Sequence, residues 1–235
     1  MARGNDPLRI GTAGWAIPRG VADAFAGSGA QIERYARVMN AVEINSSFHR
    51  PHRRTTYERW AACTPSDFQF SVKLPKTITH GSRLVGTEGP LASFADQVAG
   101  LGDRLAVVLV QLPPNLDFDE AVAGTFFREV RARLGKQIDL ACELRHGSWF
   151  TAAANTLLQR HRLARVAADP APVPAAAEPG GWSGLRYWRL HGAPRLYWSS
   201  YDQLQLDRIA QALAIGEARP QKRGACSTPR PRVRR

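Results

Sequence analysis

Short β-rich runs alternate with longer helical stretches along most of this chain, and this alternation limits its possible folds more than any other feature. Seven runs have the composition and length of strands: 9–15, 41–47, 68–75, 106–114, 138–145, 165–169 and 185–192. Helical patterns occupy 29–40, 90–102, 121–135, 151–161 and 202–214, the last beginning at Asp202, a residue type that caps helices. The pattern predicts parallel strands joined by helical crossovers. It favours one α/β domain over residues 1–215, a TIM-like (β/α) barrel, with an open doubly wound sheet as the alternative.

Residues 216–235, GEARPQKRGACSTPRPRVRR, do not continue this pattern. They contain no apolar run suited to a strand, so the eighth strand of the barrel is expected to be missing or replaced by a basic, Pro/Arg-rich, disordered tail. Two interpretations of the tail remain open: a basic arm that binds nucleic acid, or the product of a frameshift or truncation. A frameshifted or truncated end would leave the seam between the first and seventh strands open and lower the stability of the fold.

Side-chain alternation places polar residues on one face of the strands. In 138–145, Ile138, Leu140 and Cys142 form an apolar face, whereas Glu143 and Arg145 lie on the opposite face. On the other strands, the residues that share the face of Glu143 and Arg145 are also polar near the C-terminal strand end. They are Glu43, Asn45, Lys73, Gln111, Asp169, Arg189 and His191. In a barrel the side chains on this face point inward, at the C-terminal mouth where barrel enzymes place active sites. A structural network of buried Glu–Arg pairs is the alternative, but agreement over six strands favours a functional pocket.

The net charge of +12 is a weak indication of an anionic partner, because residues 216–235 carry seven Lys or Arg and one Glu. The rest of the chain has a moderate net charge of +6. Three widely spaced cysteines, Cys63, Cys142 and Cys226, match no zinc or disulfide pattern, and the longest apolar run is too short to cross a bilayer. A reducing cytoplasm without membrane association is the expected setting.

The polar mouth contains residue types for acid–base chemistry, anion binding and metal binding. The catalytic candidates are Glu43, Glu143, His146 and Lys73. A carboxylate in a low-dielectric mouth can have its pKa raised towards neutrality, while Lys73, Arg145 and Arg189 are suited to clamping an anionic group. The candidate ligands for a divalent metal are Glu43, Glu143, Asp169 and His191, although no close-spaced metal motif occurs. No nucleotide cofactor is expected, because the chain lacks a P-loop and a GxGxxG fingerprint.

Residues expected to contact the substrate come from the strand ends and the following loops. Residues 195–201, RLYWSSY, follow the seventh strand, in a region where barrel enzymes often bind phosphate. Aromatic side chains at the rim, Phe48 among them, are suited to stacking on a base or sugar. The substrate-binding candidates are Trp15, Asn45, His80, Gln111, Arg145, Asp169, Arg189, His191, Arg195, Tyr197, Ser199 and Tyr201.

Six stretches, in this order, resemble the YecE-like family, a domain of unknown function numbered 72. They are GTAGW (11–15), VEINSSFHRP (42–51), FQFSVKLPKTITH (68–80), QLPP (111–114), ELRHGSW (143–149) and RLHGAPRLYWSSY (189–201). The resemblance implies a TIM-like barrel and brings no settled activity. It also implies two departures: a Tyr usual after VEIN is replaced here by Phe48 and His49, and residues 216–235 lack the apolar eighth strand.

Two classes of function agree with these residues. The first is an enzyme of hydrolase type, acid–base or metal-assisted, acting on a phosphate-bearing substrate, with nucleic acid among the candidates. The second is a non-catalytic module that binds nucleic acid or a phosphorylated metabolite through the same cationic mouth. A sugar isomerase or lyase that uses the carboxylates is an enzymatic variant of the first.

Overall fold

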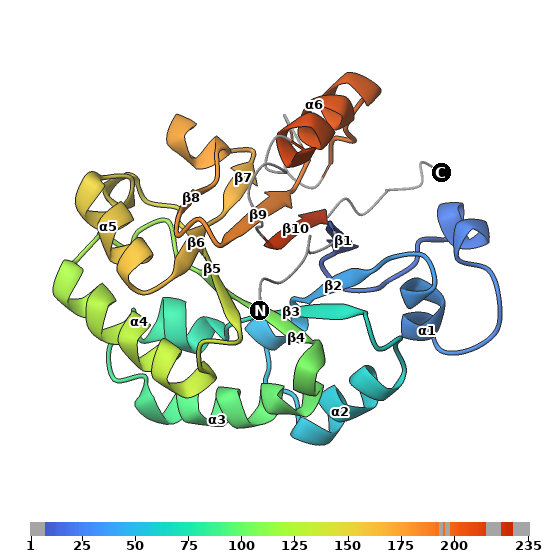
Figure 1. The fold of residues 1–235 in the computed structure, drawn as a ribbon, viewed down its shortest axis with the longest axis horizontal. Coiled ribbons are helices and arrows are strands. Elements are labelled where there is room, and N and C mark those ends of the chain that lie inside the picture. The colour runs from blue at the N-terminus through green and yellow to red at the C-terminus, as the bar shows by residue number, and fades with distance from the viewer. Residues whose placement is uncertain (1–7, 193–194, 196–197, 215–221, 228–235) are drawn as a thin grey trace, which may run out of the picture.

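A computed structural model describes residues 8–192, 195, 198–214 and 222–227 of the chain (Figure 1). A six-stranded sheet contains, in spatial order, β2 (Ala41–Ile44), β3 (Gln69–Lys73), β4 (Leu105–Gln111), β5 (Asp139–Glu143), β6 (Leu163–Arg165) and β8 (Gly180–Gly181). The first five are parallel and β8 is antiparallel to β6. The expected strands are therefore present, and the run predicted at 165–169 is divided between two strands, β6 and β7.

A four-stranded parallel sheet contains, in spatial order, β1 (Arg9–Thr12), β10 (Lys222–Ser227), β9 (Leu185–Leu190) and β7 (Ala167–Asp169). The two sheets meet where β6 passes into β7 at Val166, whose N–H donates to the Cys142 carbonyl at 3.0 Å. They meet again at a parallel bridge between Ala13 and Glu43. The fold is thus mixed α/β with mostly parallel strands, and the strand pairing forms two sheets and not one closed barrel.

The expectation that the eighth strand is missing is wrong. β10 lies within the segment predicted to be a disordered tail and pairs with β1 on one side and β9 on the other, over Arg9–Thr12 and Leu185–Leu190. The predicted open seam is therefore filled. Two parallel edges that each offer unpaired backbone groups can recruit a strand of poor intrinsic propensity, because strand formation depends more on neighbours than on composition. The remainder of the predicted tail, 216–221 and 228–235, lies outside the described residues.

Six α-helices accompany the strands in the described part of the chain: α1 (Gln31–Ala36), α2 (Arg54–Ala62), α3 (Glu88–Val98), α4 (Glu120–Leu134), α5 (Ala152–Arg160) and α6 (Gln203–Ala214). Short helical turns occur at η1 (Arg19–Phe25), η2 (Ser46–Phe48), η3 (Thr77–Gly81), η4 (Ala99–Arg104), η5 (Gly147–Trp149) and η6 (Pro174–Ala177). Figure 1 shows α2, α3 and α4 along one side of the six-stranded sheet and α6 beside β9 and β10. Asp202 accepts from the Gln205 N–H at 2.8 Å, which confirms the predicted cap of α6.

The strand faces explain where the core and the polar site lie. Val72, Val108, Leu140 and Cys142 are fully buried in the large core that the helices cover. The opposite face carries a smaller apolar cluster, with members such as Val107, Leu109, Ala141, Ala164 and Tyr187. Since alternate residues share a face, the side chains that follow this cluster toward the C-terminal strand ends lie together there. That end of the sheets is the polar site.

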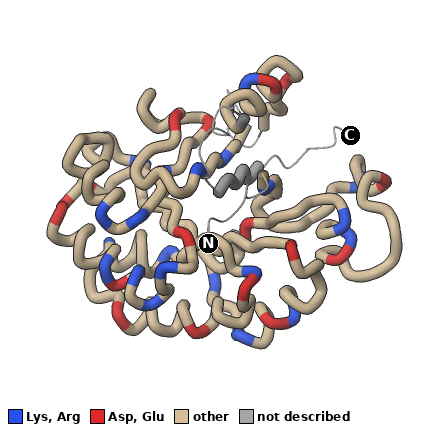
Figure 2. Tube along the Cα trace, in the orientation of Figure 1, with Lys and Arg blue, Asp and Glu red and all other residues tan. Residues whose placement is uncertain are grey.

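Charged residues of both signs are interspersed along the chain and do not gather on one side of the molecule (Figure 2). Among the described residues, no helix is long and apolar enough to span a bilayer. The distribution of charged residues along the chain therefore identifies no binding face.

Candidate anion-binding site at the strand ends

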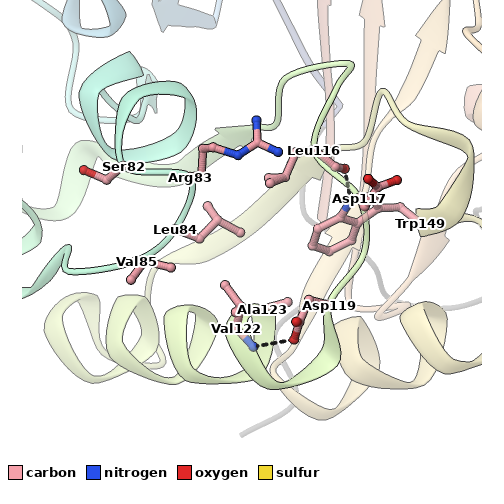
Figure 3. Close-up of a pocket in the computed structure, with 10 residues that line it drawn as sticks. All are labelled: Ser82, Arg83, Leu84, Val85, Leu116, Asp117, Asp119, Val122, Ala123 and Trp149. Carbon is pink, nitrogen blue, oxygen red and sulfur yellow. Dashed lines mark hydrogen bonds between the residues drawn. The ribbon is translucent and has the colours of Figure 1, made fainter.

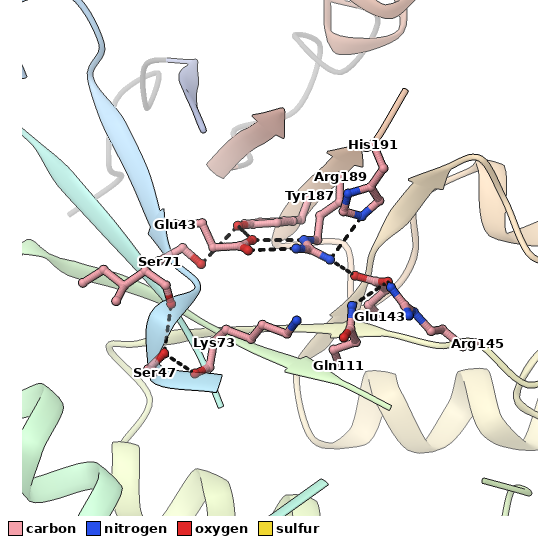
Figure 4. A network of polar contacts seen from close by, with 11 residues as sticks. Glu43, Ser47, Ser71, Lys73, Gln111, Glu143, Arg145, Tyr187, Arg189 and His191 are labelled. Atoms are coloured by element: carbon pink, nitrogen blue, oxygen red, sulfur yellow. Dashed lines mark hydrogen bonds and ion pairs between the residues drawn. The ribbon is translucent and has the colours of Figure 1, made fainter. Parts of the chain in front are cut away.

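Arg189, on β9, is the centre of a buried polar network (Figure 4). Its Nε and Nη2 donate to the two carboxylate oxygens of Glu43, at 3.0 and 2.8 Å. Its Nη1 donates to Glu143 Oε2 and lies 3.2 Å from His191 Nε2. Arg189, Glu43 and Glu143 are all at least 97% buried, because their exposed fractions are 3%, 1% and 2%. One guanidinium therefore joins carboxylates from β2 and β5, strands of the other sheet.

The Tyr187 hydroxyl, itself paired with Ser71, binds Glu43 in addition to Arg189. The Tyr187 hydroxyl lies 3.1 Å from Glu43 Oε2 and 3.1 Å from Ser71 Oγ. A phenol that donates to the carboxylate can accept from the Ser71 hydroxyl, which satisfies both groups. Glu43 thus receives three hydrogen bonds, and its two oxygens are directed at protein donors.

Glu143 is bound from three strand ends. Besides Arg189, Gln111 Nε2 donates to Oε1 at 2.9 Å, and Arg145 Nε donates to the same oxygen at 2.8 Å. Burial alone would raise the pKa of this carboxyl, but the positive fields of Arg189, Arg145 and His191 lower it to about 2. The expectation of a carboxyl tuned towards neutrality is wrong for Glu143. It is an ionised anchor for the two arginines and cannot supply a proton near neutral pH.

Lys73, at the end of β3, is buried beside this network without joining its hydrogen bonds. Its Nζ lies 3.8 Å from the ring centroid of Phe48, and the amine makes no hydrogen bond or ion pair with any described residue. Figure 4 shows the side chain pointing toward Arg189 and Gln111. Burial, followed by the positive field of Arg189, lowers the pKa of Lys73 to about 8 although Glu43 and Glu143 act against the shift. Phe48, expected to stack on a base or sugar, lies instead against this ammonium.

The charges of the described site explain the position of Lys73. Glu43 and Glu143 supply two negative charges, and Arg189 and Arg145 already balance them. A protonated Lys73 is therefore a buried cation in excess. Burying an uncompensated charge is costly, so the ammonium releases its proton more readily than a lysine in water.

Two imidazoles border the cations. His191 is 3% exposed, and burial, with Arg189 second, lowers its pKa to about 4. His80, on η3, lies edge-on to the same Phe48 ring that covers Lys73, with centroids 5.1 Å apart. Burial lowers the pKa of His80 as well, followed by the fields of Lys73, Arg145 and Lys76. Both rings are therefore neutral near pH 7.

The loop after β9 packs back on the end of that strand. Gly192 has φ +87, and a Cβ there would lie 2.5 Å from the Ser199 carbonyl oxygen, so only glycine permits this approach. The Gly192 N–H donates to the Tyr201 hydroxyl at 2.9 Å, and the Arg195 N–H donates to Ser199 Oγ at 3.1 Å. Arg195, Ser199 and Tyr201 thus form a rim beside His191, which in turn donates from its backbone to the Asp169 carbonyl at 2.7 Å. Tyr197 lies outside the described residues.

Three predicted residues have other surroundings. His146 Nδ1 lies 2.8 Å from Ser148 Oγ and 3.2 Å from Asp117, so its described contacts cap η5 and do not reach the network. Trp15 packs edge-on against Trp60 with centroids 4.9 Å apart. Asn45 is half-buried, and its Oδ1 is a buried atom without a hydrogen-bond partner in the described structure.

The sequence profile of the family described as Protein of unknown function DUF72 matches residues 9–225. The chain belongs to this family. The resemblance seen in the six sequence stretches is therefore confirmed, and the matched range runs into β10, where the eighth strand was expected to be missing.

Curated relatives of this DUF72 chain carry names without an activity. Over 174 residues it is 28% identical to UPF0759 protein YecE of Escherichia coli K12, which covers 72% of this chain and 61% of that protein. It is 29% identical over 153 residues to UPF0759 protein YunF of Bacillus subtilis 168, covering 61% of this chain and 52% of that protein. The chain thus matches less than two thirds of the length of either relative.

Solved DUF72 structures share the fold. The crystal structure of a DUF72 family protein (EF0366) from Enterococcus faecalis V583 has a TM-score of 0.77 at 18% identity, covering 94% of this chain and 89% of that one. A DUF72 family protein (TM1631) from Thermotoga maritima MSB8 has a TM-score of 0.74 at 21% identity, covering 94% and 92%. At these identities the likeness concerns architecture alone.

The metal hypothesis does not fit the donor set of this DUF72 chain. Among the described residues, no three or more His, Cys, Asp or Glu side chains are grouped as metal ligands. The guanidinium of Arg189 lies between the carboxylates of Glu43 and Glu143 and takes the oxygens that a cation would need. The four candidate ligands therefore do not form a site.

Tyr187 and Ser71 contact the network but were not among the predicted site residues. Both share strand parity with predicted residues, Tyr187 with Arg189 and Ser71 with Lys73. Side-chain alternation could therefore have identified them. They were missed because each precedes the last polar residue on its face of the strand, and the prediction considered only the C-terminal strand ends.

A second concavity lies apart from the network, between residues 82–85, 116–119 and the start of α4 (Figure 3). It has a volume of about 380 Å³, and its apolar lining residues are Leu84, Val85, Leu116, Val122, Ala123 and Trp149. Arg83, Asp117 and Asp119 supply its charged groups. None of the predicted site residues lines it, so the cavity and the polar network are separate features.

Proposed function

We propose that this DUF72 protein is an enzyme that acts on a phosphate-bearing substrate, with nucleic acid among the candidates, at the C-terminal ends of its strands. This proposal assumes a TIM-like barrel, in which the two sheets together surround the polar network. Barrel enzymes use that end of the strands for catalysis.

The observation that carries the proposal is the excess positive charge at Lys73. Two carboxylates are already balanced by Arg189 and Arg145, so an anionic ligand would supply the missing countercharge. After burial, the positive charges of Lys73, Arg145 and Lys76 each lower the pKa of His80, in agreement with a cationic surrounding at this rim. A phosphate group suits such a cluster, because it accepts several charge-assisted hydrogen bonds at once.

Proton transfer in such an enzyme would fall to Lys73 and His80. A lysine with a pKa of about 8 can accept or release a proton in the physiological range, and the lowered pKa of His80 leaves its ring neutral and able to accept a hydrogen bond near pH 7. Glu43 and Glu143 would fix the arginines in place, so that of the predicted catalytic residues Lys73 keeps this role and His80, predicted to bind the substrate, joins it.

A labelled single-stranded oligonucleotide tests the proposal when binding and cleavage are both measured, with and without Mn²⁺, and with inorganic phosphate as competitor. Lys73→Met is expected to weaken binding about tenfold, which corresponds to about 1.4 kcal/mol. Lys136→Met is the matched control, because Lys136 is exposed and precedes β5 at the opposite strand end. Equal weakening in both variants, or no competition by phosphate, would remove the strand-end site as the binding site.

A non-catalytic binding module is the second candidate, and one observation favours it. Both carboxylates of the network are saturated, Glu43 by Arg189 and the Tyr187 hydroxyl and Glu143 by two arginines and the Gln111 amide, as in a purely architectural ion cluster. This candidate predicts that Lys73→Met changes affinity while no turnover of any phosphate ester occurs in the parent protein. Cleavage that disappears in Lys73→Met would exclude it.

A further inference from the structure

Lys73 combines three properties that the anion-binding role does not require. It is 5% exposed, its amine has no hydrogen bond or ion pair with any described residue, and it lies over the Phe48 ring at 3.8 Å. Exposed Lys76, three residues later at the same rim, has none of this burial. A lysine that serves only as a phosphate ligand works as a solvated point charge, as Lys76 can.

We propose that Lys73 forms an imine with the carbonyl carbon of a phosphorylated aldehyde or ketone. This inference rests on the proposed function, since the phosphate of the ligand is held by the same cationic rim. It narrows the substrate class from any phosphate ester to a phosphorylated carbonyl compound.

The surroundings of the Lys73 amine favour its neutral form, which is the form that attacks a carbonyl carbon. Arg189 from β9 and Arg145 after β5 disfavour its protonation, while Glu43 from β2 and Glu143 from β5 favour it, and burial decides the balance. A substantial neutral fraction is therefore present near pH 8. The carboxylates do not capture the amine, because their oxygens are taken up by Arg189, Tyr187, Gln111 and Arg145.

The step balances without a further reactant. The lone pair of Nζ adds to the carbonyl carbon, and a proton moves from nitrogen to the carbonyl oxygen to give a carbinolamine. The hydroxyl then takes up a proton and leaves as water, forming the carbon–nitrogen double bond. Solvent water supplies and takes up these protons, and His80 contacts the same Phe48 ring that covers the Lys73 amine. A protonated imine keeps the positive charge of Lys73, so its attraction to the ligand phosphate persists.

Borohydride trapping with pyridoxal 5′-phosphate, an aldehyde that carries a phosphate, tests the inference on the full chain. The sequence contains four lysines, Lys73, Lys76, Lys136 and Lys222, so peptide mass spectrometry can assign each reduced adduct. At pH 8, Lys73 is expected to be labelled at least about tenfold faster than Lys76 or Lys136, and inorganic phosphate should protect it. Lys73→Arg, which keeps the charge, should lose the major adduct, and Lys76→Arg should retain it.

Pyridoxal without the phosphate separates the two proposals. Slower labelling of Lys73 by pyridoxal than by its phosphate ester supports both. Equal labelling by the two aldehydes overturns the phosphorylated substrate class and, with it, the proposed function. The inference that Lys73 has a reactive amine would still hold. If Lys73 is labelled no faster than Lys136 although phosphate still competes with the oligonucleotide, the imine is overturned and the proposed function is unaffected.

Discussion

Arg189 shows how a single buried residue can determine both stability and site geometry. It is the only described side chain that bonds to both Glu43 and Glu143, and so it ties one sheet to the other. A buried ion pair adds little compared with well-packed apolar residues, but removing one partner leaves the others uncompensated. The network is therefore more sensitive to loss of its central cation than its size suggests.

Arg189→Ala is expected to lower the free energy of unfolding by about 3–5 kcal/mol, because buried Glu43 would lose its arginine partner and Glu143 would keep only Arg145. Urea denaturation of the parent and variant measures this difference. Arg133→Ala is the control, since Arg133 pairs with Glu129 at the surface and should cost less than about 1 kcal/mol. Similar losses in the two variants would show that the buried network contributes no more than a surface pair.

The pH dependence of stability should also report on the network. The pKa of Glu143 is lowered to about 2 in the folded protein from its ordinary value of 4.5, so the folded state releases this proton more readily than the unfolded state. The resulting stabilisation is complete above about pH 4.5 and is lost as the pH falls towards 2, a change on the order of 3 kcal/mol. Denaturation midpoints measured from pH 6 to 2 should show a shallower decline in Glu143→Gln. A parallel decline in both proteins would contradict this assignment.

Helix ends determine stability at the scale of a single element. Helix α4 begins after Asp119, whose carboxylate accepts from the Val122 N–H at 3.0 Å. Asp119 also borders the apolar cavity of Figure 3, so the cap lies where the loop before α4 meets the cavity wall that Val122 and Ala123 of α4 help to form.

Asp119→Ala should lower the free energy of unfolding by about 1 kcal/mol, because the first turn of α4 loses its side-chain cap. Asp119→Asn keeps an acceptor oxygen and should recover most of this loss. Thermal denaturation of the three proteins measures both effects. If the alanine and asparagine variants are equally destabilised, the charge of Asp119 and not its cap would be responsible.

Sequence patterns predicted some elements well and others poorly, for physical reasons. Strand alternation brought Glu43, Lys73, Gln111, Glu143 and Arg189 to one face, since parity is a local property of the chain. The same rule could not give the ionisation of these groups, which depends on which strands become neighbours in space. Composition failed for β10, because its pairing depends on two edges formed by residues far away in sequence.

At the scale of the whole molecule, β10 decides whether the four-stranded sheet is continuous. Without it, β1 would lose its pairing within that sheet, and β9 would keep only β7 as a neighbour. Both freed edges would expose unpaired backbone groups.

A chain that ends at residue 214 is therefore expected to melt at least about 5 °C below the parent, a shift that corresponds to roughly 2 kcal/mol in a protein of this size. A chain that ends at Ser227 retains β10 and is the control; its Tm should stay within about 2 °C of the parent. Calorimetry of the three proteins measures these shifts. Equal Tm values for the two shortened chains would mean that β10 adds nothing to stability.

The position of β10 between β1 and β9 also has a consequence for protein synthesis. β1 (Arg9–Thr12) is synthesised long before β10 (Lys222–Ser227), the strand that it pairs with. The five parallel strands β2 to β6 can pair with sequential neighbours as they appear, but β1 finds its partner in the four-stranded sheet only after β10 has been synthesised. Until then this edge of β1 is exposed and can pair with other chains, a hazard that chaperones or rapid synthesis of the intervening segment reduce.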